Sequence, residues 1–355
     1  MTFFNNKLSI VSDSLDNIFL FRWEEGNISL NSFNNRTKIS TKEKIVKGAL
    51  QEYDVSISSK GDIYLIYQDD TMNLILTVLR EDNREDVKLT AEPIPEIYDL
   101  HILNNKEEPH IIYFVMLPDE GKKYRMYHHY FNGEEWITHI VDEVRVKQIL
   151  NPIRIIKENN KIILGYYKYE EQEEIYYKEF DLDKKQWKNS LPLTNNGTDR
   201  LYLDMLKDED HIHLTYSEYY NGNFIIKYER LSYGEDGFKK DVEETLSNEE
   251  NPSNPTLIYY EDKIWIAWIE YDNVMSRYSE DGGLTWSPIY LWNESKQADI
   301  VRYKCLNRDS EDNITLNYYF GRVHPEIAFI GFGSVENATE VPSKKKITFN
   351  RYPRI

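Results

Sequence analysis

The stretch SEDGGLTW at residues 279–286 lies between two strand-like runs and has the composition of a tight turn. Its two adjacent glycines tolerate the positive φ angles that a turn between antiparallel strands requires. Ser279 and Asp281 are short acceptors that can bind backbone amides inside the turn. Trp286 begins the next strand and can cover the turn with a large apolar face. We therefore expect Asp281 to brace a hairpin rather than to act as a catalytic acid.

Every defined position of this stretch fits the pattern Ser-x-Asp-x-Gly-x-x-Trp. The pattern resembles the Asp-box, also called the BNR repeat, of sialidases and other β-propeller proteins. The positions that carry the resemblance are Ser279, Asp281, Gly283 and Trp286. The resemblance implies an all-β chain in which the box is a hairpin turn on the rim of a blade, away from the active face. The box occurs in glycoside hydrolases, in receptors and in non-enzymatic propellers, so it implies a fold and not an activity.

Weaker copies of this turn recur along the chain. They lie at residues 23–27, 131–136, 181–187 and 233–238. An aromatic residue follows most of the turns, and we expect these aromatic residues to fill the space between neighbouring blades. They are Trp136, Trp187, Phe238 and Trp286.

An alternating run of Ile, Leu, Tyr and Trp also repeats. Its copies begin about 50 residues apart, which is the period of one four-stranded propeller blade. The copies lie at residues 7–13, 62–67, 110–114, 161–166, 211–216, 263–268 and 313–318. Each copy after the first is preceded by another strand-like run, which we expect to be the innermost strand of its blade. These innermost runs lie at residues 52–57, 97–102, 153–156, 201–205, 256–259 and 300–303.

The first repeat lacks an innermost run, and the chain ends with a strand-like run at residues 346–352. We expect this terminal strand to become the innermost strand of the first blade, which closes the ring and leaves no open edge. The sequence thus predicts one all-β domain over residues 1–355, a seven-bladed β-propeller of four-stranded antiparallel blades, with six blades as the alternative. No helix is expected, and residues 38–50 are expected to form a connection into the second blade.

Composition narrows the classes of function. The 355 residues carry a formal net charge of −18, which argues against nucleic acid and anionic membranes as partners. The single cysteine, Cys305, excludes an internal disulfide framework. We find no signal peptide and no apolar run that would span a membrane, so we expect a cytoplasmic protein or one exported by a non-classical route. The residue usage resembles that of an AT-rich bacterial genome, and the oligomeric state stays open.

The predicted innermost strands carry polar groups from which we expect a ligand site at the central channel. Arginine can hold a carboxylate in bidentate fashion, and tyrosine can stack on a sugar ring. The candidate ligand-binding residues are Arg154, Arg302, Arg351, Tyr53, Tyr98, Tyr202 and Tyr303. Either these groups bind an acidic sugar or a peptide carboxylate, or they pair with one another and with carboxylates such as Asp204 in a narrow, wet channel.

Two carboxylates are the candidate catalytic residues. Asp54 and Asp99 lie in equivalent Tyr-Asp contexts of neighbouring repeats. Glycosidases need two carboxylates at a defined separation, so this pair is the one that a glycoside hydrolase or lyase would use at the channel mouth. The Arg-Ile-Pro motif that sialidases have near the amino terminus does not occur there. Similar residues stand at Tyr352–Ile355, in another order and at the opposite end of the chain.

His211 and His213 lie two residues apart on one face of a strand, but no third ligand with suitable spacing follows them. We therefore expect no metal site. There is no phosphate-binding glycine loop and no Ser-His-Asp signature, so no cofactor is expected. The sequence favours a non-catalytic binding or scaffolding propeller whose ligand is a glycan or a protein, with a glycan at the central channel preferred. The alternatives are the hydrolase and a structural protein of a bacterial spore or surface layer.

Overall fold

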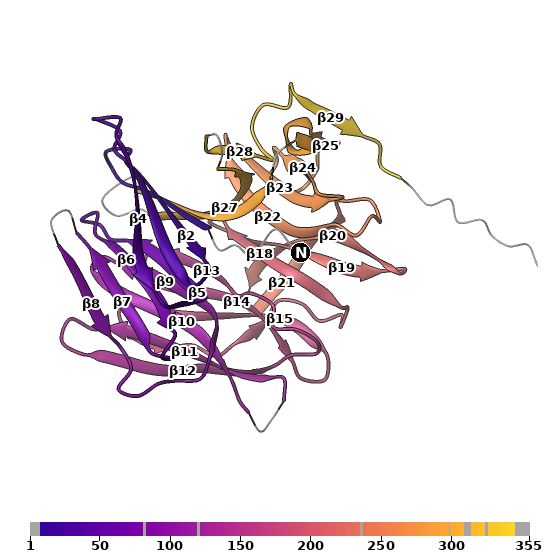
Figure 1. The fold of residues 1–355 in the computed structure, drawn as a ribbon. Helices are drawn as coiled ribbons and strands as arrows, with labels where there is room; N and C mark the ends of the chain where they lie inside the picture. The colour runs from indigo at the N-terminus through magenta and orange to yellow at the C-terminus, as the bar shows by residue number, and fades with distance from the viewer. Residues whose placement is uncertain are drawn as a thin grey trace, which may run out of the picture. The chain divides into compact units, whose positions relative to one another are not determined.

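The computed structural model describes residues 8–80, 83–118, 121–234, 237–297, 299–308, 314–323 and 326–344. These residues form strands, turns and one short 3-10 helix, η1 (Asn293–Gln297). The strands pair into six sheets of four to seven strands, an all-β architecture that is consistent with a β-propeller (Figure 1). The chain divides into two compact units, Met1–Thr198 with Asp299–Phe329 and Asp199–Ala298 with Ile330–Ile355. The single domain expected over residues 1–355 stays a prediction.

Three sheets of the first unit follow the predicted repeat and consist of antiparallel strand pairs. The first contains β5 (Ala49–Ile57), β6 (Ile63–Asp69), β7 (Leu74–Leu79) and β8 (Arg84–Lys88). The second contains β9 (Ile97–Asn105), β10 (Glu108–Met116), β11 (Lys123–Phe131) and β12 (Trp136–Arg145). The third contains β13 (Arg154–Glu158), β14 (Lys161–Tyr169), β15 (Glu173–Asp181), β16 (Gln186–Trp187) and β17 (Leu191–Pro192). Strands β6, β10 and β14 are buried on both faces over most of their length, which explains why the repeated runs are so apolar.

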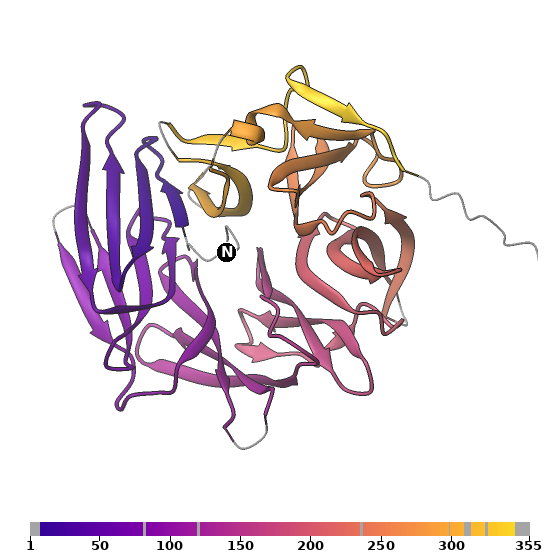
Figure 2. The same ribbon diagram turned by 45° about the vertical axis from the view of Figure 1, so that its right-hand side comes forward.

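The second unit contains two sheets of the same pattern (Figure 2). One contains β18 (Arg200–Lys207), β19 (His211–Tyr220), β20 (Asn223–Gly234) and β21 (Gly237–Thr245). The other contains β22 (Ser253–Tyr260), β23 (Lys263–Glu270), β24 (Asn273–Ser279), β25 (Ile289–Trp292) and β29 (Ala338–Val341). Strand β29 pairs with β25 in antiparallel fashion and so adds a fifth strand at this edge.

A seven-stranded sheet joins the first repeat to the last. Its strands, in spatial order, are β28 (Ala328–Ile330), β27 (Ile314–Arg322), β26 (Val301–Arg308), β1 (Leu8–Ser12), β2 (Ile18–Glu24), β3 (Asn27–Phe33) and β4 (Ser40–Lys47). Strand β1 pairs in parallel with β26, so the edge of β1 that the terminal strand was expected to occupy already has a partner. The terminal run at residues 346–352 lies outside the described residues. The seven blades and the closure of the ring therefore stay predictions.

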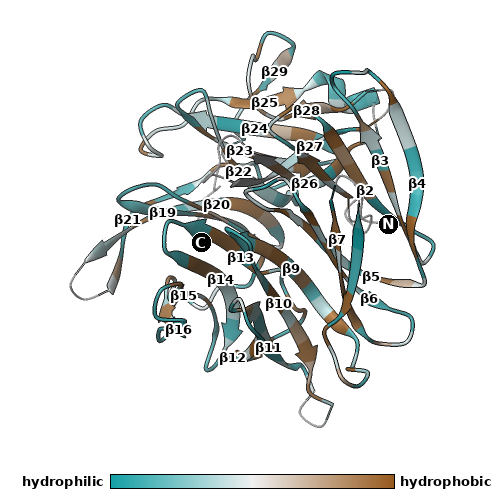
Figure 3. Ribbon diagram, turned by 90° about the vertical axis from the view of Figure 1, so that its left-hand side faces the viewer, coloured by the Kyte–Doolittle hydropathy of each residue, from teal (hydrophilic) through white to brown (hydrophobic). Residues whose placement is uncertain are grey.

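Strand β4 corrects one expectation. Residues 38–50 were expected to form a connection, but Ser40–Lys47 pairs with β3 as the outermost strand of its sheet. The first five residues of β4 are exposed, so the strand has no alternating apolar pattern, and Figure 3 shows it largely in the hydrophilic colour. Charged edge strands of this kind also resist pairing with other chains.

The aromatic residues that follow the turns pack mostly as expected. Trp136 contacts an apolar cluster that joins β6 and β7 to β9 and β10, and Trp187 contacts a cluster that joins β10–β12 to β14 and β15. Trp286 contacts a cluster that joins β20 to β22–β25. Phe238 differs, because it packs edge-on against the exposed Tyr233 of its own hairpin, with ring centroids 5.0 Å apart.

Candidate functional site

The Asp-box turn follows β24, and its polar side chains are bound within the turn. The carboxylate of Asp281 accepts hydrogen bonds from the backbone amides of Leu284 (3.1 Å) and Thr285 (2.9 Å). It also accepts a hydrogen bond from the hydroxyl of Ser279 (2.7 Å). The Thr285 hydroxyl donates to the same carboxylate, and these bonds lower the pKa of Asp281 to about 2. Asp281 is therefore a charged brace of the hairpin.

Gly283 anchors this turn against Tyr228 of β20. Its φ is +86°, and a Cβ atom placed on it would lie 1.8 Å from the Tyr228 hydroxyl oxygen. Trp286 lies edge-on against the same tyrosine ring, with centroids 4.8 Å apart. The Tyr228 hydroxyl also lies 2.7 Å from Nδ1 of His213, whose Nε2 lies 2.9 Å from Asp208. The turn and the histidine thus belong to the packing of the second unit, and no group of three potential metal ligands occurs among the described residues.

The inner-strand aspartates connect neighbouring sheets through the backbone. Each accepts a hydrogen bond from an amide in or next to the first strand of the following sheet: Asp54 from Ile102 (2.8 Å), Asp99 from Ile153 (2.6 Å) and Asp204 from Leu257 (2.9 Å). The first two belong to the first unit and the third belongs to the second. A β-bulge accompanies all three, and it re-aims the side chain toward the neighbouring sheet. The candidate catalytic residues Asp54 and Asp99 therefore have a structural task that their sequence context does not reveal.

Asp54 also forms a buried ion pair. Its two carboxylate oxygens lie 2.8 and 2.7 Å from Nζ of Lys304 on β26, which also donates to the carbonyl oxygen of Val55 (3.0 Å). Both side chains of the pair are only 6% exposed. His101 stands beside this pair, with Nδ1 4.0 Å from Asp54 and Nε2 3.0 Å from Asp99.

Two of the predicted arginines meet on one tyrosine in the first unit. The guanidinium carbons of Arg154 (β13) and Arg302 (β26) lie 4.6 and 4.5 Å from the ring centroid of Tyr318 on β27. Burial raises the pKa of Tyr318, whereas the two guanidinium groups act in the opposite direction. Asp54 and Asp99 face the same tyrosine and raise its pKa further. We refer to Asp54, Asp99, Arg154, Arg302 and Tyr318 as the inner-strand cluster.

The predicted tyrosines lie elsewhere. Tyr53 is buried and donates to the carbonyl oxygen of Phe21 (3.1 Å), and Tyr303 is buried beside the carbonyl oxygen of Ala328 (3.3 Å). Tyr53 directly precedes Asp54, and Tyr303 directly follows Arg302. Successive side chains of a strand point to opposite faces of its sheet, so neither tyrosine points toward the inner-strand cluster. Tyr98 packs edge-on against Tyr124 at 5.7 Å. Tyr202 belongs to the second unit and has a φ of +62°. Arg351 lies outside the described residues, as do Tyr352 and Arg354.

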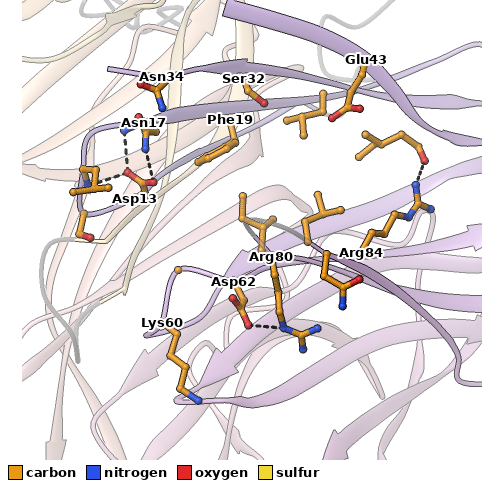
Figure 4. Close-up of a pocket in the computed structure, with 18 of the residues that line it drawn as sticks. Asp13, Asn17, Phe19, Ser32, Asn34, Glu43, Lys60, Asp62, Arg80 and Arg84 are labelled. Atoms are coloured by element: carbon orange, nitrogen blue, oxygen red, sulfur yellow. Dashed lines mark hydrogen bonds and ion pairs between the residues drawn. The ribbon is translucent and has the colours of Figure 1, made fainter. Parts of the chain in front are cut away.

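A groove of about 830 Å³ opens in the first unit (Figure 4). One wall comes from β2–β4 and the turn after β1, and the other comes from β6–β8 and the turns that join β5 to β6 and β7 to β8. Phe19 and several aliphatic side chains form its apolar part, and Asn34, Lys60 and Arg80 are among its polar residues. No sequence motif indicated this groove, because its residues come from many separate segments.

Membrane insertion through a helix has no support in the described part of the chain, where no helix is long and apolar enough to cross a bilayer.

No family model and no curated protein matches this chain. Among solved structures, one from a study of two prolyl endopeptidases has a TM-score of 0.55 and 10% identity. That alignment covers 90% of this chain and 46% of the other, so this chain spans less than half of that protein. A mutant of the Aleuria aurantia lectin in complex with Fucα1-6GlcNAc has a TM-score of 0.47 and 10% identity, with 80% of this chain and 94% of the lectin covered. A mutant of AofleA from Arthrobotrys oligospora has a TM-score of 0.46 and 11% identity, with 81% and 87% covered. At these identities the first similarity concerns the fold alone, and the two lower TM-scores carry no argument about function.

Proposed function

We propose that this protein is a non-catalytic, glycan-binding β-propeller protein whose inner-strand cluster holds the carboxylate of an acidic sugar. The observation that carries the proposal is the placement of Arg154 and Arg302 over the ring of Tyr318. The guanidinium group of arginine is a planar fork of N–H donors. Such a fork matches the two oxygens of a carboxylate, which it binds in bidentate fashion.

The surroundings of the cluster support recognition of an anion. Arg154 is 6% exposed, and Tyr318 is half-buried, so an ion pair formed beside them would be weakly screened by solvent. Arg302 is half-buried, so solvent reaches part of its side chain. The cation–π contacts with Tyr318 also restrict both arginine side chains before binding, which lowers the entropy lost when the ligand arrives.

The carboxylates of the cluster support binding rather than hydrolysis. A glycosidase needs one carboxyl group as the acid and another as the base or nucleophile. Asp54 is held by Lys304 and the amide of Ile102, and Asp99 by His101 and the amide of Ile153. Both groups therefore have fixed positions in which their oxygens accept bonds from the protein itself.

The test is a glycan array that contains sialylated, uronate-bearing and neutral oligosaccharides, probed with the purified chain and with two variants. Arg302→Lys keeps the positive charge but removes the planar fork, so it should weaken binding to acidic glycans by about tenfold. Arg145→Lys is the matched control, because Arg145 is exposed on β12 and outside the cluster. Equal binding by both variants, or a wild-type protein that retains no acidic glycan, would refute the proposal.

The hydrolase alternative makes a different prediction for Asp99→Asn. The structural role of Asp99 predicts a lower melting temperature, because the asparagine replaces the charged acceptor of the Ile153 amide and the partner of His101. A hydrolase would lose turnover with an unchanged melting temperature. If the array shows trimmed glycans, and Asp99→Asn loses turnover at an unchanged melting temperature, the function is hydrolysis rather than binding.

A further inference from the structure

We propose that the groove between the seven-stranded sheet and the sheet of β5–β8 is a second binding site, specific for a neutral, hydroxyl-rich oligosaccharide. The groove is lined by β2–β4 on one side and β6–β8 on the other (Figure 4). It shares no residue with the inner-strand cluster, so this proposal does not depend on the function proposed above.

The apolar part of the groove suits the ring face of a sugar. Phe19 is half-buried and contacts the core cluster of the first unit, which holds its ring in place. Leu30, Ile45 and Ile63 are buried beside it and are 5%, 8% and 4% exposed. An aromatic ring on an aliphatic floor is the surface against which the C–H face of a pyranose packs. The volume of about 830 Å³ is within the range of small-molecule sites and accommodates more than one sugar ring.

The rim offers donors and acceptors that the fold has not used. The Ser32 hydroxyl and the Lys60 ammonium group make no hydrogen bond within the described part of the chain. The side chain of Asn34 accepts bonds at Oδ1 from the backbone amide and the hydroxyl of Thr37 (2.9 and 3.0 Å), and its Nδ2 has no partner among the described residues. A ligand with many hydroxyl groups needs both kinds of partner at fixed positions.

Two arginines at the rim are already oriented by the protein. Nε of Arg80 lies 3.0 Å from Asp62, and the Arg84 side chain donates to the carbonyl oxygen of Ile45 (2.6 Å), a contact visible in Figure 4. Arg84 also pairs with Asp86 at 3.0 Å. Arg80 pairs with Glu85 as well, at 3.1 Å. These contacts restrict both side chains before a ligand binds, which lowers the entropic cost of binding.

The charges of the groove are nearly balanced, which favours a neutral ligand. Its cations are Lys44, Lys60, Arg80 and Arg84, and its carboxylates are Asp13, Glu43 and Asp62. Both arginines have carboxylate partners, as the preceding distances show, and the Asp13 carboxylate is bound by the amides of Leu15 and Asn17 (both 2.9 Å). An acidic ligand would lose its hydration in the groove and would be repelled by Glu43. The positive charge that remains unpaired there is too small to offset this cost.

The experiment uses the full chain on a printed array of neutral oligosaccharides built from glucose, galactose, mannose, fucose and N-acetylhexosamines. A retained oligosaccharide is then titrated by calorimetry into the wild type and three variants. Ser32→Trp fills the groove and should weaken binding by about tenfold or more. Lys60→Ala removes one donor from an exposed turn and should weaken binding by about two- to tenfold. Lys42→Trp is the control, because Lys42 is exposed on β4 and is not part of the groove.

Melting temperatures show whether each variant is folded, and Lys60→Ala decides the question should Ser32→Trp fail to fold. The proposal is supported when Lys42→Trp binds as the wild type does and the groove variants bind more weakly. It is overturned when no neutral oligosaccharide is retained, or when the groove variants bind it as tightly as the wild type does.

Discussion

Lowering the pH should destabilise the first unit through two buried histidines, His110 of β10 and His128 of β11. Both are fully buried; their rings stack at 5.1 Å, and Nδ1 of His110 lies 2.9 Å from Nε2 of His128. Trp187 donates its indole N–H to Nδ1 of His128 at 3.2 Å. Since an indole can only donate, His128 is neutral with its proton on Nε2, and it donates to His110. The Nε2 proton that remains on His110 has no acceptor among the described residues.

The magnitude follows from proton linkage. Burial, with smaller effects of Lys185 and Lys157, lowers the pKa of His110 to about 3. Burial and the neighbouring His110 hold the pKa of His128 well below its ordinary value. The unfolded chain takes up protons at these side chains as the pH falls through about 6.5, while the folded chain does not. Their contribution to stability is therefore fully present above that pH and is lost below it. For the pair, the free energy of unfolding should fall by about 4 kcal/mol between pH 8 and pH 5.

Urea unfolding at several pH values between 8 and 5 measures this loss. The double variant His110→Phe/His128→Phe leaves the Trp187 N–H without its acceptor, but that cost is the same at every pH. Its free energy of unfolding should therefore fall by about 2.5 kcal/mol less than that of the wild type between pH 6 and pH 5. Parallel curves for the wild type and the double variant would refute the reasoning.

Two further substitutions test the packing. Gly283→Ala should lower the free energy of unfolding by more than about 2 kcal/mol, because the new methyl group meets the Tyr228 hydroxyl at a residue with positive φ. Gly222→Ala is the control, because Gly222 has a φ of +90° but no atom within 4 Å of the added methyl group, so this variant carries the backbone strain alone. Equal urea midpoints for the two variants would contradict the prediction. Lys304→Met should lower the free energy of unfolding by about 3–5 kcal/mol at pH 7, because it leaves the buried Asp54 carboxylate without its cation. A variant that melts at the wild-type temperature would show that the ion pair does not stabilise the protein.

Local patterns were sufficient to predict most strands. The run at β6 (Ile63–Asp69) is recognisable because it is buried on both faces and therefore apolar. The turn after β24 is recognisable because Asp281 binds a backbone amide of the same turn and Gly283 adopts the positive φ that the turn requires. Strand β4 was wrongly expected to be a connection because its first five residues are exposed and only its backbone pairing makes it a strand. A pattern of side chains cannot report a pairing that depends on the backbone of a neighbour.

The candidate site was predictable only in part. Arg154 and Arg302 lie on β13 and β26, and the structure brings them to one tyrosine, although Tyr318 was not among the predicted residues. Asp99 has the same sequence context whether it acts as an acid or as a link between sheets. The deciding facts are its φ of +52° and the amide of Ile153, 54 residues away. Such contacts between distant segments leave no local trace in the sequence.

The ion pair of Lys304 and Asp54 explains how the first unit holds its ends together. Lys304 lies on β26, opposite Ser9 of β1 in the parallel pairing, and its ammonium group reaches Asp54 on β5. One side chain therefore links the last repeat, the first repeat and the second. Asp54 in turn accepts the amide of Ile102 on β9, so the link continues into the next sheet. Desolvating this pair is costly, and apolar residues would pack there at least as stably. Unlike an apolar contact, the ion pair can form in only one register of β1 against β26. We therefore infer that its role is to specify the register of this parallel pairing.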